Sequence, residues 1–84
     1  MQVFAQGTIV KIDEVPAYVE EENAAVLKLK ASGVMTAAYR RRAGPGVLIM
    51  LEADSIADAE KEMEALPFIE FGIMTLEYDE IYSI

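Results

Sequence analysis

The stretch Ser55–Tyr78, with the sequence SIADAEKEMEALPFIEFGIMTLEY, combines a helix start, a helix end and a strand. Ser55 suits the N-cap position, because its hydroxyl can accept a hydrogen bond from a free amide of the first helical turn. Asp58, three residues later, can bond back to the cap or interact favourably with the helix dipole. Apolar residues then recur at steps of three or four, at Ile56, Ala59, Met63 and Leu66. This spacing predicts a helix with one apolar face.

The same stretch marks where this helix ends and the last strand begins. Pro67 disfavours helical geometry at the residue before it, so we expect Leu66 to be the last helical residue. Gly72 can supply the turn that follows. Ile73–Tyr78 is rich in residues that favour strands, and we expect the last strand there.

The first part of the chain predicts a strand followed by a long helix. Met1–Ile12 is rich in β-forming residues, and both of its alternating sets are largely apolar, which favours a strand covered on both faces. Asp13 can cap the helix that follows, and Pro16 suits its first turn. An apolar stripe then runs to Gly33, a natural helix C-cap, and predicts a helix of about 16 to 18 residues.

A hairpin is predicted between the two helices. Val34–Arg41 and Val47–Ala53 favour strands, and the Ala-Gly-Pro-Gly sequence of residues 43–46 favours a turn. The order is therefore β-α-β-β-α-β, which belongs to the α+β class and is typical of the ferredoxin-like, split βαβ arrangement. In that arrangement both helices cover one face of a four-stranded antiparallel sheet. We expect residues 1–84 to form this single domain.

The face of the sheet that the helices leave open is also predicted to be apolar. Apolar residues occupy both alternating sets of the third strand, Val47, Ile49 and Leu51 against Leu48 and Met50. We assign the last strand the same character, with Met74, Leu76 and Tyr78 against Ile73, Thr75 and Ile81. A face in contact with water should be mostly polar. We therefore expect a second copy of the chain to cover this face, giving a homodimer or a higher homo-oligomer.

The composition argues against several classes of protein. The net charge is −8 with only seven Lys and Arg residues, which argues against nucleic acid as a partner, because binding it needs a basic surface. No apolar run approaches the length of a membrane span, and no basic, apolar leader opens the chain, so we expect a soluble cytoplasmic protein that binds no membrane. Cysteine and histidine are both absent. The sequence therefore predicts no metal site and no cofactor, and leaves carboxylates, tyrosines, lysines and arginines for any chemistry.

A set of features spread over most of the chain matches a known family pattern. It includes a carboxylate in the first helix, a glycine that ends the helix, an aromatic-Arg pair, an Ala-Gly turn, and a capped helix that ends in Leu-Pro shortly before an aromatic residue. In this chain these features are Glu22, Gly33, Tyr39-Arg40, Ala43-Gly44, Ser55, Leu66-Pro67 and Phe71. With them the chain resembles the muconolactone isomerase family, part of the dimeric α+β barrel group that also includes YciI-like proteins.

The chain also departs from that pattern. The family's histidines have no counterpart here, and where the family has a Pro-Tyr pair this chain has Glu70-Phe71. YciI-like proteins usually contain a His-Asp pair, which this chain lacks. The resemblance therefore implies the dimeric α+β barrel fold more directly than the activity.

The activity that the resemblance implies is the transfer of a proton within an unsaturated lactone. It needs a base for a proton next to a carbonyl group and a positive group for the enolate oxygen. Glu22 is the candidate base, because it interrupts the apolar stripe of the first helix and should face the sheet or a pocket, where burial raises its pKa. Arg40 is the candidate positive group. The alternative is that Glu22 pairs with Arg40 or a lysine as a purely structural contact.

Four other residues are candidates for substrate binding: Tyr39, Tyr18, Glu52 and Phe71. Tyr39 and Arg40 should lie on opposite sides of their strand, because neighbouring residues alternate. Glu52 lies within a predicted strand, where it can point inwards or face water.

Two functions follow from these observations. The first is an isomerase-like small enzyme that transfers a proton within an anionic, lactone or enol-type metabolite, with Glu22 and Arg40 as catalytic residues. The second is a non-catalytic oligomeric module of the same fold that binds a small molecule or serves in assembly.

Overall fold

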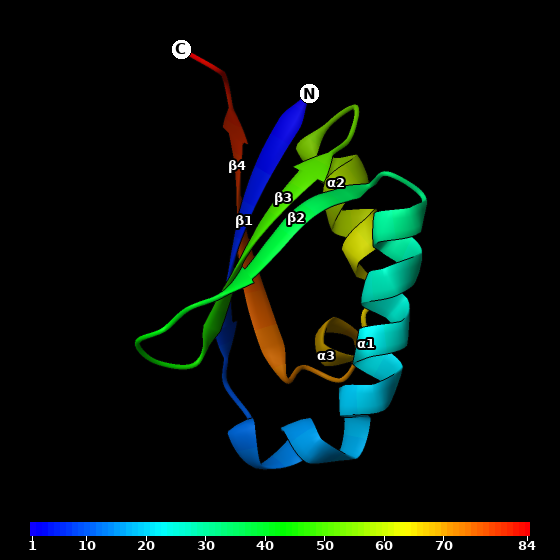
Figure 1. Cartoon of the computed structure of the whole chain (residues 1–84), viewed down its shortest axis with the longest axis vertical. Helices are drawn as coiled ribbons and strands as arrows, with labels where there is room; N and C mark the ends of the chain where they lie inside the picture. Colours follow the sequence, from blue (N-terminus) through cyan, green and yellow to red (C-terminus); the bar gives the residue numbers. More distant parts are fainter.

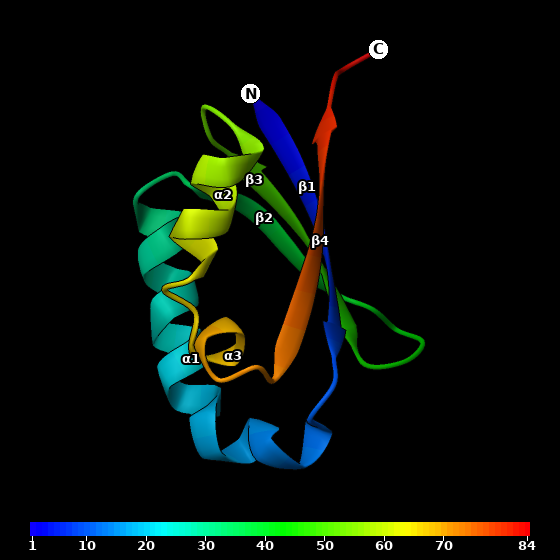
Figure 2. The ribbon, with the colours of Figure 1, turned by 180° about the vertical axis from the view of Figure 1, so that it is seen from behind.

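The computed structural model describes residues 1–84 and contains one sheet with helices on one of its faces (Figure 1; Figure 2). The elements in chain order are β1 (Gln2–Ile9), the 3₁₀ helix η1 (Ile12–Glu14), α1 (Val15–Ala31), β2 (Met35–Arg40), β3 (Gly46–Glu52), α2 (Ile56–Met63), α3 (Pro67–Glu70) and β4 (Met74–Ile81). All paired strands are antiparallel, and their order in the sheet is β2-β3-β1-β4. The predicted β-α-β-β-α-β order and the ferredoxin-like α+β fold are confirmed, with α3 as an additional short helix.

Helix α2 begins where the sequence predicts but ends earlier. Ser55 has an extended backbone, and its Oγ accepts a hydrogen bond of 3.0 Å from the backbone N–H of Asp58, as expected of an N-cap. The helix ends at Met63 rather than at Leu66. Pro67 then opens a new helical turn, α3, because the first residue of a helix needs no N–H group.

The region before α1 also differs from the prediction. β1 ends at Ile9 rather than Ile12, and η1 occupies the next segment, so the predicted capping role of Asp13 is wrong. α1 has 17 residues, in the predicted range. Gly33 follows it with φ of 84°, a left-handed conformation that glycine adopts without a steric penalty. Each helix falls short of the combined length and hydrophobicity that a membrane-spanning helix requires.

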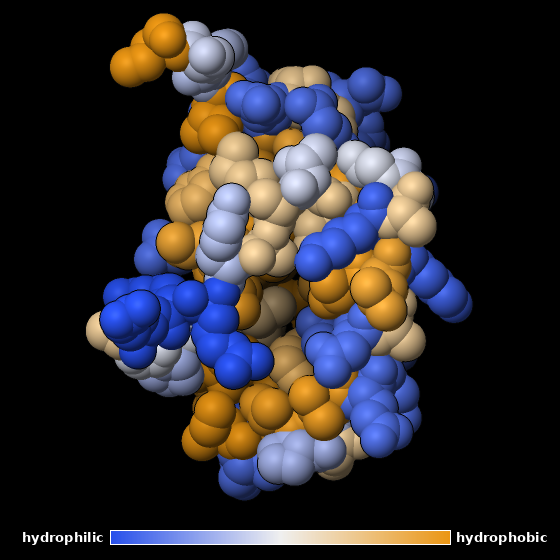
Figure 3. Space-filling model, viewed as in Figure 1, coloured by the Kyte–Doolittle hydropathy of each residue, from blue (hydrophilic) through white to orange (hydrophobic).

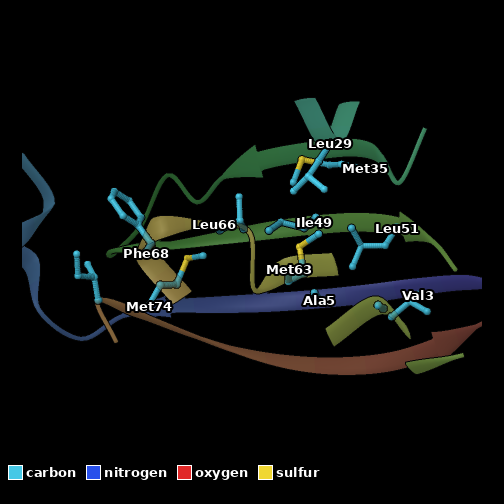
Figure 4. Close-up of a cluster of buried hydrophobic side chains, with 12 residues drawn as sticks. Val3, Ala5, Leu29, Met35, Ile49, Leu51, Met63, Leu66, Phe68 and Met74 are labelled. Atoms are coloured by element: carbon cyan, nitrogen blue, oxygen red, sulfur yellow. The ribbon is translucent and has the colours of Figure 1, made fainter. Parts of the chain in front are cut away.

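The hydrophobic core lies between the sheet and the helices (Figure 4). Its buried side chains come from every strand and every α-helix: Val3, Ala5, Leu29, Met35, Ile49, Leu51, Ala59, Met63, Leu66, Phe68, Ile73 and Met74. In the two central strands Val3 pairs with Leu51 and Ala5 with Ile49, so these residues form the floor on which the helices pack. Because residues alternate along a strand, this register also fixes which side chains point to the open face.

The open face of the sheet is apolar over only part of its area. Glu77 and Asp79 of β4 lie opposite Gln6 and Phe4 of β1 on this face. The prediction that β4 is apolar on both faces is therefore wrong. The exposed or partly exposed apolar side chains gather on the other three strands, at Phe4, Leu48, Met50 and Tyr39.

Candidate functional site

A cavity of about 410 Å³ opens between the helix-facing side of the sheet and α1. Figure 3 shows it as a hollow between the turn that joins β2 to β3 and α1, hydrophilic on the side of the turn and hydrophobic along the lower rim. Most of the lining side chains are apolar, and they come from both sides of the hollow. Glu22 and Arg40 are the two ionisable residues among them. A cavity of this size and character is suited to a small molecule.

Glu22 reaches the cavity because of its position on α1. Val15, Val19 and Val26 also line the cavity, and with Glu22 they recur at steps of four, three and four, so all four lie on one face of the helix. Glu22 is only 7% exposed. Its Oε1 accepts a hydrogen bond of 2.9 Å from the backbone N–H of Phe68, at the start of α3.

The second carboxylate oxygen of Glu22 is free. Oε2 has no hydrogen-bond partner within the chain and is not sealed from solvent. The ion pairs of the structure are Lys11 with Glu14 and the N-terminal amine with Glu52, so the structural pairing of Glu22 with Arg40 or a lysine does not form. The contact that Glu22 makes is instead with a backbone amide.

The surroundings of Glu22 change its acidity. Burial removes the carboxylate from water and raises the pKa of Glu22 above its ordinary value, while the hydrogen bond from Phe68 lowers it by a smaller amount. Because the effect of burial is larger than that of the hydrogen bond, the carboxyl group of Glu22 is easier to protonate than one on the surface. It can therefore both accept and return a proton nearer to neutral pH.

Arg40 lines the cavity because of an irregularity in β2. Met35 pairs with Leu51 on the helix-facing side, and the register shifts before Ala37. This bulge changes the alternation, so that Ala38 and Arg40, rather than their neighbours, join Met35 in lining the cavity. Bulges of this kind redirect side chains next to binding sites.

The four candidate substrate-binding residues lie elsewhere. Tyr39 is 61% exposed on the open face, and Glu52 lies at the end of β3 with Oε2 3.7 Å from the N-terminal amine. Tyr18 and Phe71 stack on each other, with ring centroids 4.6 Å apart and planes inclined by 24°. None of the four lines the cavity, so the proposed site does not include them.

Three parts of the cavity were not predicted from the sequence. The first is the backbone N–H of Phe68, whose role as a hydrogen-bond donor cannot be predicted from the residue type. The second is the turn at residues 44–46, which the sequence predicts as a connection between strands but which also lines the cavity. The third is Gly7 beneath the floor. A Cβ atom at Gly7 would lie 2.7 Å from Cγ2 of Val47 and 3.1 Å from Sδ of Met74, both lining residues. A glycine within a strand can signal such a close approach.

No cluster of three or more acidic side chains is arranged to hold a metal ion. The ionisable groups of the cavity are one carboxylate and one guanidinium. Their chemistry is that of proton transfer and of binding negative charge.

The comparisons with known proteins support the fold. No family model and no curated protein matches the sequence. Among solved structures the chain is similar to a muconolactone isomerase, with a TM-score of 0.75 and 18% identity over 100% of this chain and 91% of that one. It is also similar to a 5-chloro-2-hydroxyhydroquinone dehydrochlorinase from Burkholderia phenoliruptrix AC1100 in complex with 2,5-dihydroxybenzoquinone, with a TM-score of 0.70 and 14% identity over 95% of this chain and 93% of that one.

A third similar structure is protein Atu4242 from Agrobacterium tumefaciens, with a TM-score of 0.52 and 11% identity over 95% of this chain and 92% of that one. The resemblance to the muconolactone isomerase group is thus confirmed as a similarity of fold. At these identities the activity does not follow from the fold.

Proposed function

We propose that this chain is a small acid–base enzyme that transfers a proton within a lactone or enol-type metabolite. The observation that carries the proposal is a buried carboxylate, Glu22, facing a largely apolar cavity that also contains Arg40. Perturbed ionisable groups in a cleft are typical of catalytic sites. Two solved structures of similar fold are enzymes, a muconolactone isomerase and a dehydrochlorinase bound to a dihydroxybenzoquinone, which supports an isomerase-like small enzyme.

The reaction requires a base, a stabilised anion and the return of the proton. Oε2 of Glu22 takes a proton from a carbon next to the substrate carbonyl, and the electron pair of the broken C–H bond moves to the carbonyl oxygen. The guanidinium of Arg40 stabilises the negative charge of the resulting enolate or of a substrate carboxylate. Glu22 then returns the proton to another carbon of the conjugated system. The product is an isomer of the substrate, and no atom or electron is gained or lost.

The direct test is exchange of substrate protons with solvent. The wild-type protein is incubated in deuterated water with a panel of unsaturated lactones and enol acids, and deuterium incorporation and isomer formation are followed by NMR. We expect exchange at the carbon next to the carbonyl for at least one member. Arg40→Gln should raise KM for its carboxylate-bearing members about tenfold or more, because a charged hydrogen bond is lost.

Arg42→Gln is the matched control for Arg40→Gln. Arg42 belongs to the same run of arginines but does not line the cavity. The KM of the Arg42→Gln variant should therefore stay at the wild-type value. If no compound of the panel exchanges protons with solvent or isomerises, the enzyme proposal loses its basis. Binding without exchange would favour the alternative, a non-catalytic binding module.

We also propose that a second copy of the chain covers the open face of the sheet, giving a homodimer. The apolar side chains Phe4, Leu48 and Met50 have no covering layer from their own chain. The acidic residues Glu77 and Asp79 lie at one side of the apolar area, on β4, which leaves it with a polar border. An apolar area with a polar border is typical of a protein interface.

Leu48→Asp should convert the dimer into a folded monomer, because it places an unpaired charge at the centre of the proposed interface. Sedimentation velocity at micromolar concentration measures the change, and circular dichroism checks the fold. Thr75→Asp, at the edge of the same face on β4, is the control and should remain dimeric. A compact wild-type monomer at this concentration would contradict the dimer.

A further inference from the structure

Two contacts join α3 to α1, and they lie one helical turn apart on both elements. On α1, Tyr18 precedes Glu22 by four residues; on α3 and its end, Phe68 precedes Phe71 by three. The polar contact is the hydrogen bond from the Phe68 N–H to Oε1 of Glu22. The aromatic contact is the stack of Tyr18 on Phe71. Together with the burial of the Phe68 side chain in the core, these contacts define the position and the rotation of α3 on α1.

Helix α3 depends on packing for its position: Leu66 and Phe68 are buried in the core, and the two contacts with α1 add to this packing. It has four residues, and the side chain of its N-cap residue, Leu66, makes no capping hydrogen bond. A helix of this length does not form by itself in water. Its backbone amides are therefore correctly oriented only while the helix is held in place by packing.

The orientation of the Glu22 carboxylate depends in turn on α3. Oε1 has one partner, the Phe68 amide, and this bond leaves Oε2 free to face the cavity. Without the bond the carboxylate could rotate about its terminal torsion, which has a broad energy profile. An active base needs one orientation, because small misplacements of a reacting group reduce the rate strongly.

We propose that Tyr18 and Phe71 are positioning residues for Glu22, acting through α3 and the Phe68 amide. The inference rests on the proposed role of Glu22 as the base. It gives Tyr18 and Phe71 a function outside the cavity, where they touch neither the substrate nor the reacting atoms. The Tyr18–Phe71 stack helps to keep α3 in place on α1. In this position of α3, the Phe68 amide donates the hydrogen bond that orients the Glu22 carboxylate.

Few ionisable groups lie near Glu22, so the effect of losing the Phe68 hydrogen bond on the pKa of Glu22 can be predicted. Arg40, on β2, is the other ionisable residue of the cavity lining, and β1, β3 and β4 contribute only apolar residues or glycine. Glu70 of α3 is exposed. The hydrogen bond from Phe68 lowers the pKa of Glu22 while burial raises it, so loss of the bond should raise the pKa of Glu22 further.

The test compares Tyr18→Ala and Phe71→Ala with Tyr18→Phe, which keeps a ring for the stack. The readouts are the titration of the Glu22 carboxyl carbon by NMR, hydrogen exchange of the Phe68 amide, and kcat and KM. Both alanine variants should raise the pKa of Glu22 and lose at least about tenfold of the amide protection. Their kcat should fall about 10- to 100-fold with little change in KM, because the base is misplaced while the cavity persists.

Tyr18→Phe should restore the wild-type values of all three readouts. Tyr82→Ala is the matched control, since Tyr82 is an exposed tyrosine far along the chain, and it should behave as wild type. Wild-type titration and amide protection in Tyr18→Ala would overturn the proposal, as would an equal loss in Tyr18→Phe. If Tyr18→Ala does not fold, Phe71→Ala decides the outcome.

The two proposals can fail separately. Absence of both substrate exchange and isomer formation with the wild-type protein contradicts the assignment of the enzyme activity. The titration of Glu22 and the protection of the Phe68 amide test the positioning role without any substrate.

Discussion

Glu22→Gln should abolish proton transfer while leaving the fold intact. Removing a general base typically reduces the rate by 10²- to 10⁴-fold. Glutamine has nearly the same shape, and its amide oxygen can still accept the hydrogen bond from the Phe68 N–H. We expect no deuterium incorporation into the substrate above the solvent background, with an unchanged backbone NMR spectrum outside the cavity.

The same substitution should make the protein more stable at neutral pH. Burial raises the pKa of Glu22, so between the unfolded and folded pKa values the folded state binds more protons than the unfolded state. Stability then falls as the pH rises through this interval, and the cost of the buried charge is fully present above it. Glutamine carries no charge and removes this cost. The free energy of unfolding of Glu22→Gln should therefore exceed that of wild type at neutral pH and approach it in acid.

Urea unfolding at neutral and at acid pH measures this difference, with Glu21→Gln as the control on the neighbouring, exposed position. A purely structural role for Glu22 gives another result. In that case the free energy of unfolding of Glu22→Gln would be lower than that of wild type at neutral pH. The difference between the two proteins would also be larger at neutral pH than in acid.

Leu51→Ala should be the most destabilising single change in the core. Leu51 is completely buried and lies on the helix-facing side of β3, paired with Val3 and Met35. Leu-to-Ala changes at such sites reduce the free energy of unfolding by about 2–5 kcal/mol. A domain of this length has a total stability of roughly 4–13 kcal/mol. The variant should therefore lose a large share of its stability.

Leu27→Ala provides the matched control, because Leu27 is 66% exposed on α1. It should change the free energy of unfolding by no more than about 0.5 kcal/mol. Both variants are compared by urea unfolding at one protein concentration, because association contributes to apparent stability. Equal losses in the two variants would contradict the assignment of Leu51 to the core.

Much of the fold could be predicted because its signals are local. The Ser55 hydroxyl caps α2 as the residue type predicts, and Gly33 takes the left-handed conformation after α1. The errors occur where two local signals compete. Pro67 predicts the end of α2, but it also starts α3. Asp13 predicts an N-cap for α1, but η1 forms at that position instead.

The site was less predictable, because it depends on contacts between distant residues. The helical period alone places Glu22 among the apolar residues of α1. The side of β2 on which Arg40 lies depends on a bulge that no residue type announces. The amide of Phe68 comes from a residue 46 positions away from Glu22, and nothing in either residue predicts the pairing.

The shape of the cavity is sensitive to substitution at Gly7, a buried residue of β1 that lies against the cavity-lining side chains. A methyl group at this position would press on the side chains of Val47, Leu76 and Met74, and the β-branched Val47, which is the nearest, has little rotational freedom to give way. Val47 and Met74 would have to move, and both line the cavity. The range of molecules that fit can therefore change through one buried position that touches no ligand. Selection for a smaller or larger substrate could act there while Glu22 and Arg40 stay unchanged.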